Sequence, residues 1–75
     1  MDDFELDRIR QAYKETVEKW IAAIRREEVL ATPDHSIGAW DRWDHAHFAE
    51  EHVRKEALAA RERYVAGLRE IDYGF

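Results

Sequence analysis

Apolar residues in the first part of the chain recur at intervals of three, four or seven positions. They form a single row that comprises Leu6, Ile9, Tyr13, Val17, Trp20, Ile24 and Ala31. Side chains at these intervals lie on one face of an α-helix. Acidic residues stand at the start of the segment, and Arg25 and Arg26 stand near its end, which suits the helix dipole. The pattern predicts a long amphipathic helix over residues 3–31.

The pattern is interrupted once, over residues 32–38, which we predict to be a loop. Pro33 disfavours helical geometry at the residue before it, so the first helix should end near Ala31. Alternatively, that preceding threonine caps a short extra turn with Pro33 at its first position. Ser36 and Asp41 are the two candidate N-caps of the next helix. Because the connection is short, the flanking helices should be antiparallel neighbours.

A second helix is predicted over residues 39–72, followed by a short aromatic tail. Its main row alternates steps of three and four, the spacing of a coiled-coil seam. This row comprises Trp43, Ala46, Glu50, Val53, Ala57, Ala60, Tyr64, Gly67 and Ile71. A second apolar row lies beside it and comprises Trp40, Leu58, Val65 and Leu68. Together the two rows cover roughly half of the helix circumference, which is wider than one antiparallel partner requires.

The predicted fold is therefore all-α: a single domain over residues 1–75, built as a long antiparallel hairpin of two helices. The helices would be about 42 Å and 50 Å long, and no third element would cover their open side. Small helical scaffolds commonly bury such surfaces by oligomerising. We expect a homodimer in which two hairpins form a four-helix bundle. The expected dimer seam is Trp43, Ala46, Glu50, Val53, Ala57, Ala60, Tyr64 and Leu68. The alternative is a monomer whose second helix bends and folds back.

Composition supports a helical chain and narrows the class of protein. The chain has 75 residues, of which only 3 are glycine and 1 is proline, and it has no cysteine. Disulfides and thiolate metal sites are therefore excluded. With 45% hydrophobic and 39% charged residues, the chain is too apolar for a disordered acidic tail. This composition is also unlike that of a nucleotide-binding α/β domain or a β-sandwich.

The charge balance indicates which partners to expect. The net charge is −5, and neither half of the chain contains a basic block, so we expect no nucleic-acid partner. An acidic inhibitor that occupies a nucleic-acid-binding site is an alternative. No window approaches eighteen consecutive apolar residues, so we expect no membrane span. The acidic N-terminal segment does not resemble a secretory signal, and a cytoplasmic location is the expectation.

The four histidines fall within eighteen residues and stand among acidic side chains. At helical spacing they form two triplets on neighbouring faces, one of Asp41, His45 and His52 and one of Asp44, His47 and Glu51. Zinc accepts such nitrogen and oxygen ligands, so a bundle that binds zinc or another divalent metal is an alternative function. A dimer could also pair two half-sites. Neither His-Glu-x-x-His nor Glu-x-x-His occurs in this segment, and surface or helix-capping roles explain the same residues.

Exposed aromatic residues are the candidates for contacts with a protein partner. Phe48 projects from the far side of the second helix, on a row that continues to Tyr73. The C-terminal tail ends in Phe75, and Gly74 would let the chain leave the helix in a left-handed conformation. We predict partner binding by Phe48, Tyr73 and Phe75; alternatively, the tail folds back over the bundle end. The tryptophans Trp20, Trp40 and Trp43 are expected in the core, with an exposed Trp40–Trp43 pair as the alternative.

Glu50 is the single charged residue of the main row, and we expect it to pair with Arg54 four residues later. The sequence contains no glycine-rich phosphate loop and no nucleophile and base at motif spacing. We therefore expect no enzymatic activity and no required cofactor. The predicted function is a small protein–protein interaction or oligomerisation module, such as an adaptor, regulator or inhibitor, whose protein partner the sequence does not identify.

Overall fold

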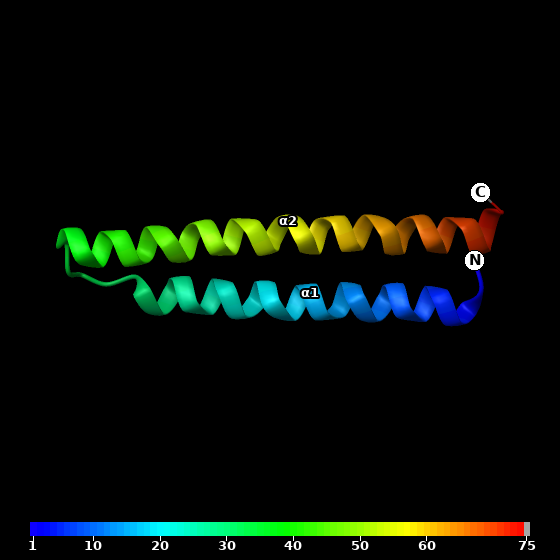
Figure 1. Ribbon diagram of the computed structural model, residues 1–75, viewed down its shortest axis with the longest axis horizontal. Helices are drawn as coiled ribbons and strands as arrows, with labels where there is room; N and C mark the ends of the chain where they lie inside the picture. Colours follow the sequence, from blue (N-terminus) through cyan, green and yellow to red (C-terminus); the bar gives the residue numbers. More distant parts are fainter. Residues whose placement is uncertain (75) are drawn as a thin grey trace.

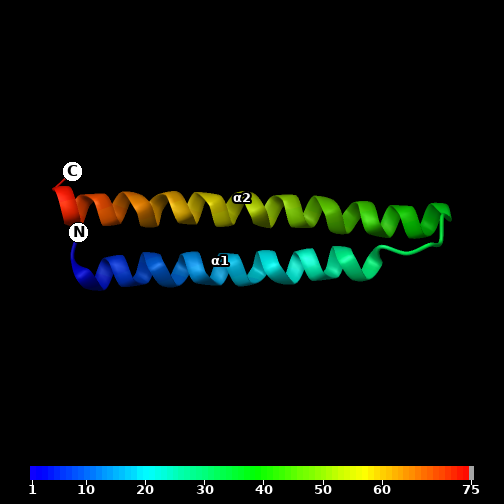
Figure 2. The same cartoon turned by 180° about the vertical axis from the view of Figure 1, so that it is seen from behind.

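The computed structural model describes residues 1–74 as two antiparallel α-helices joined by a short loop (Figure 1). Helix α1 spans Asp3–Leu30 and helix α2 spans Ile37–Tyr73. The prediction of an all-α helical hairpin is confirmed, with helix ends one or two residues from those expected. The view from behind shows the same two helices side by side, with the N- and C-terminal ends of the hairpin together at the end opposite the loop (Figure 2).

The helix ends lie where local side chains satisfy the unpaired backbone groups. Asp2 caps α1 by accepting a hydrogen bond from the backbone N–H of Glu5 at 2.7 Å. Of the two candidate N-caps of α2, Ser36 is the one used, and its Oγ accepts from the N–H of Ala39 at 3.2 Å. Gly74 ends α2 in the left-handed region at φ 75°, as predicted from the sequence.

The loop contains no extra helical turn. Asp34 orders it by accepting hydrogen bonds from both the backbone N–H and the hydroxyl of Ser36, at 2.9 and 3.1 Å. Thr32 Oγ1 in turn accepts from the N–H of Asp34 at 3.3 Å. The alternative in which Thr32 caps a short helix before Ser36 is therefore wrong, because its hydroxyl serves the turn that places the cap of α2.

Small residues line the face of α2 that packs on α1. The buried apolar residues of the described chain are Ala39, Ala46, Ala57 and Ala60. Gly67 extends this face: a Cβ atom there would lie 2.9 Å from Leu6 Cδ1. Helix α1 contributes larger residues that are only half-buried, such as Tyr13, whose ring centroid lies 6.0 Å from that of Tyr64. The close approach of the helices therefore leaves few large side chains to fill a core.

The seam predicted for a second copy is largely occupied by α1 of the same chain. Ala46, Glu50, Ala57 and Ala60 are buried in the single hairpin, and they cannot be the surface that a second copy covers. Trp43, Val53 and Tyr64 are half-buried, whereas Leu68 lies at the edge of the seam. The assignment to a dimer seam needs this correction because the most regular row of a helix is the row that its first neighbour takes.

The tryptophans are less buried in the single chain than expected. Trp40 is 65% exposed, so its predicted place in the core is wrong for the isolated hairpin. It stacks on the half-buried Trp43, with ring centroids 5.7 Å apart. Trp20, near the middle of α1, is half-buried between the helices as the row predicted. The indole pair at the start of α2 extends beyond α1 because α1 ends at Leu30.

Candidate functional site

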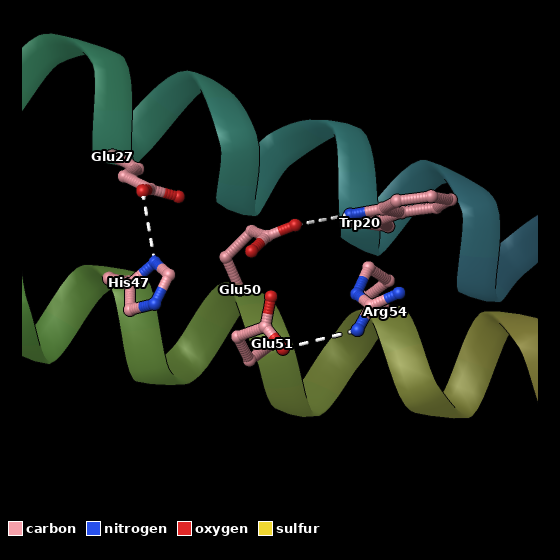
Figure 3. A network of polar contacts seen from close by, with 6 residues as sticks. All are labelled: Trp20, Glu27, His47, Glu50, Glu51 and Arg54. Atoms are coloured by element: carbon pink, nitrogen blue, oxygen red, sulfur yellow. Dashed lines mark hydrogen bonds and ion pairs between the residues drawn. The ribbon is translucent and has the colours of Figure 1, made fainter.

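Polar side chains gather between the helices near the middle of the hairpin (Figure 3). Those drawn there come from both helices: Trp20 and Glu27 from α1, and His47, Glu50, Glu51 and Arg54 from α2. Trp20 and Glu27 are seven residues apart, so they occupy equivalent positions on the inner face of α1. His47 and Glu50 are three apart and neighbour each other on α2. The antiparallel packing brings these two pairs together.

Glu50 is the buried acid of this cluster, with 8% of its surface exposed. Its Oε1 accepts a hydrogen bond from the Trp20 indole Nε1–H at 2.6 Å. Within residues 1–74, no cationic group lies at ion-pair distance from it. The carboxylate therefore has one neutral donor and no counter-charge from the chain.

The predicted Glu50–Arg54 pair does not form. Arg54 Nη2 instead donates to Glu51 Oε2 at 3.2 Å, and Arg54 Nε is buried with no acceptor in the described chain. Spacing along one helix identifies both carboxylates as neighbours of Arg54. It takes no account of Trp20, which supplies a hydrogen bond to Glu50 from the other helix.

His47 is held by contacts on both sides of its ring. Its Nδ1 lies 3.3 Å from Glu27 Oε1 across the helix interface. Trp43 stacks on the imidazole with ring centroids 5.5 Å apart and planes 5° from parallel, and Phe48 packs at a tilt on it at 5.8 Å. These contacts fix the imidazole plane and point Nδ1 toward α1.

Glu27, His47 and Glu50 form a compact group of potential metal ligands. One ligand atom from each residue lies within 4.8 Å of the others; Glu50 is buried, and Glu27 and His47 are half-buried. They line a hollow of about 370 Å³ whose other walls are Ile24, Glu28, Ala31 and Trp43. We refer to these three residues as the Glu–His–Glu cluster.

Of the six residues predicted to bind metal, only His47 belongs to this cluster. His45 and His52 are exposed, and each has a single nearby carboxylate, Asp41 at 3.6 Å and Glu56 at 3.0 Å respectively. Asp44 and Glu51 are half-buried on the same helix, and Glu51 is engaged by Arg54. Among the described residues neither predicted triplet converges into a group of potential ligands, whereas the group that does converge draws on both helices.

Sequence reasoning overlooked Glu27 and Glu50 as potential ligands. Glu27 lies seven residues after Trp20, at an inner-face position where an acid is unusual, and Glu50 had been assigned a structural role. Both signals were present in the sequence, but joining them requires knowing which positions of the helices lie opposite each other. Tyr13 opposite Tyr64 gives that alignment in the structure.

One side of the hairpin is apolar, and we call it the open face. In the hollow described above, Ile24 and Ala31 of α1 and Trp43 and His47 of α2 line the same side. Rows at helical spacing from these residues continue along both helices. The exposed large apolar residues of these rows are Ile21, Ile24, Trp40, Leu58 and Leu68, with exposed fractions of 37–65%.

The opposite side carries basic groups. A hollow of about 650 Å³ there is lined by Arg25, Arg26, Val29, Leu30, Arg42, His45, Ala46 and Ala49. Nearer the chain ends, Glu5, Arg8 and Arg63 line a second hollow. The hollows of about 370 and 650 Å³ therefore differ in the sign of their charged groups, which are acidic on the open face and basic on the opposite side.

Two of the predicted partner-binding aromatics lie in the described part of the chain and are exposed. Phe48 and Tyr73 are 65% and 71% exposed. Phe75 lies outside the described residues. Partner binding by these three residues stays a prediction.

Comparisons with protein-family models, curated proteins and solved structures find no match to this chain. In the described residues, neither helix has a stretch long and apolar enough to cross a membrane. The function must therefore be argued from the geometry of the hairpin itself.

Proposed function

We propose that the protein is a self-association module, in which two hairpins pack through their open faces as a homodimeric four-helix bundle. The observation that carries this proposal is the absence of any fully buried large side chain among the described residues. A hairpin with so little interior of its own has most to gain from a partner.

The exposed surface area of the hairpin is larger than that of a compact monomer of the same mass. It amounts to 5972 Å², whereas a compact monomer of 9.0 kDa exposes about 4,850 Å². The excess of about 1,100 Å² exceeds the roughly 800 Å² that each partner buries in a standard protein interface. Association of two copies would therefore bring the exposed surface per chain into the range of ordinary folded proteins.

The shape of the molecule supports the same proposal. The hairpin measures 56 × 16 × 13 Å with a radius of gyration of 17.1 Å, against about 11 Å for a compact domain of this length. A thin rod buries area efficiently only along its side. The open face offers such a side, with exposed apolar residues spread along its length: Ile21 and Ile24 on α1, and Leu58 and Leu68 on α2.

A two-fold axis would make this interface self-complementary, because each copy presents the same rows to the other. The chain would then act by assembly, as an adaptor, regulator or inhibitor, rather than by catalysis. Exposed groups outside the interface, such as Phe48, would remain on the surface of each copy.

The test is the solution mass of the full chain by light scattering at micromolar concentration, with helix content followed by circular dichroism. We expect twice the 9.0 kDa chain mass. Leu58→Arg, which places a charge on the open face, should shift the mass toward one chain and lower the helix content. Val29→Arg is the matched control, because Val29 is 80% exposed on the side opposite the open face.

A wild-type mass of one chain at these concentrations, with full helix content, would contradict the proposal. Equal effects of Leu58→Arg and Val29→Arg would show that the open face is not the interface.

A further inference from the structure

The Glu–His–Glu cluster places two carboxyl groups next to each other at the helix interface. Glu50 is buried, whereas the side chains of Glu27 and His47 are partly exposed, at 21% and 39%. Removing a carboxylate from water costs several kcal/mol unless a cation or several donors compensate. Glu50 receives one hydrogen bond, from a neutral indole. Arg54, the nearest candidate counter-charge on its own helix, is engaged by Glu51. Within residues 1–74, no lysine or arginine lies at ion-pair distance from Glu50 or Glu27, so His47 is the one group of the cluster that can carry a positive charge.

The donor set suits a transition-metal ion rather than a hard cation. One imidazole nitrogen and two carboxylate oxygens match the ligands that zinc accepts. Magnesium and calcium prefer oxygen ligands alone, whereas imidazole favours zinc and its neighbours in the first transition row. A lysine or arginine side chain could also neutralise the Glu50 carboxylate, but within residues 1–74 none lies at ion-pair distance from it.

The spacing of the donors is close to what a small metal ion requires. Two ligands on a tetrahedral zinc ion lie about 3.3 Å apart, given metal–ligand bonds of about 2.0–2.1 Å. His47 Nδ1 and Glu27 Oε1 are 3.3 Å apart. All three donors lie within 4.8 Å of one another, so a rotation of the Glu50 carboxyl group would complete a three-ligand site.

The surrounding residues orient the donors. The Trp20 indole holds one oxygen of Glu50 by a hydrogen bond (Figure 3). Trp43 stacks on the imidazole of His47 and restricts its rotation. Outer contacts of this kind commonly set the orientation of metal ligands.

We propose that Glu27, His47 and Glu50 bind one divalent transition-metal ion, with zinc as the probe. A fourth ligand position would open onto the hollow beside Ile24 and Ala31. All three ligands belong to one chain, so the site can be tested apart from the proposed homodimer, although this hollow lies on the open face that the homodimer would cover. It also differs from the histidine triplets of α2, since two of its three ligands are outside those triplets.

The experiment is calorimetric titration of the full chain with zinc chloride after removal of metal by a chelator. We expect saturable binding of one zinc ion per chain and a rise in melting temperature. His47→Gln and Glu50→Gln should each weaken zinc binding by more than about tenfold. The matched controls are His45→Gln and His52→Gln, which remove exposed histidines that also lie near a carboxylate. These should change the affinity by less than about twofold.

Circular dichroism keeps the test independent of folding. Gln at position 50 retains an oxygen that can accept from Trp20, so the variant should keep the helix content of the wild type. Three outcomes would overturn the proposal: no saturable zinc binding by the wild type, equal losses in the control and cluster variants, or a loss with Glu50→Gln but not with His47→Gln. The last would identify a pair of carboxylates without the imidazole ligand.

Discussion

At the scale of single residues, Glu50 has a different partner in the structure from the one that its helical spacing predicts. In the sequence it interrupts a seam of small apolar residues, and the helix rule assigns it to Arg54. In the structure it turns to Trp20 on the other helix, and Arg54 turns to Glu51. Within residues 1–74, the result is a buried carboxylate that accepts one hydrogen bond, from an indole, together with a buried Arg54 Nε that has no acceptor.

Glu50→Gln should stabilise the metal-free protein. The substitution removes a buried charge while it keeps an acceptor for the Trp20 indole, so the free energy of unfolding should rise by roughly 1–3 kcal/mol. Urea unfolding in the presence of a chelator, at fixed protein concentration, measures this change. Glu62→Gln, at an exposed position of α2, is the control and should stay within about 0.5 kcal/mol of the wild type. A destabilised Glu50→Gln variant would mean that the charge itself holds the helices together.

At the scale of helices and loop, much of the structure follows from the sequence. The three- and four-residue spacing identified both helices, and Pro33, Ser36 and Gly74 marked their ends within one or two residues. Periodicity gives the inner face of each helix, but not which residues of the two inner faces meet. For that reason His47 was found as a candidate ligand, whereas its partner Glu27, twenty residues earlier on the other helix, was not.

Replacing the glycine at each end of α2 with alanine should change the free energy of unfolding in opposite directions. Gly38 has negative φ and lies in the first turn, where an added Cβ would meet Arg42 Nη1 at an ordinary 3.4 Å. Gly38→Ala should therefore raise the free energy of unfolding by up to about 1 kcal/mol through helix propensity. Gly74→Ala should lower it by about 1 kcal/mol, because Gly74 has φ 75°. Thermal unfolding of both variants beside the wild type tests the pair, and two changes of the same sign would contradict it.

At the scale of the whole molecule, the hairpin brings its two ends together. The Met1 amino group donates to Glu70 Oε1 at 2.6 Å and so ties the start of α1 to the last turns of α2. The hydrogen bond and the charge of Glu70 hold the pKa of the Met1 amino group above its ordinary value of 8.0. This contact is solvent-exposed, and its contribution depends on the charge of the amino group.

Stability should consequently decline at alkaline pH. A group whose pKa is higher in the folded state stabilises that state below its unfolded pKa, near 8.0, and loses the effect as pH rises through the folded value. Melting temperatures of the wild type should therefore fall above pH 8 more steeply than those of Glu70→Gln. Acetylation of the amino group should remove the same difference. Parallel curves for the three proteins between pH 7 and 10 would show that the contact contributes no stability.

The alanine lining between α1 and α2 has one more consequence. Ala39, Ala46, Ala60 and Gly67 recur at multiples of seven residues and present a small surface at every step of that row except the one that Val53 occupies. Sliding one rod past the other by two turns would replace one methyl group with another and change the apolar contact little. The bond between Trp20 and Glu50 and the pairing of His47 with Glu27 would both be broken by such a slip. The polar contacts near the middle of the hairpin thus fix the register of α1 against α2. Without them, the hairpin would lose this unique register before it lost its helices.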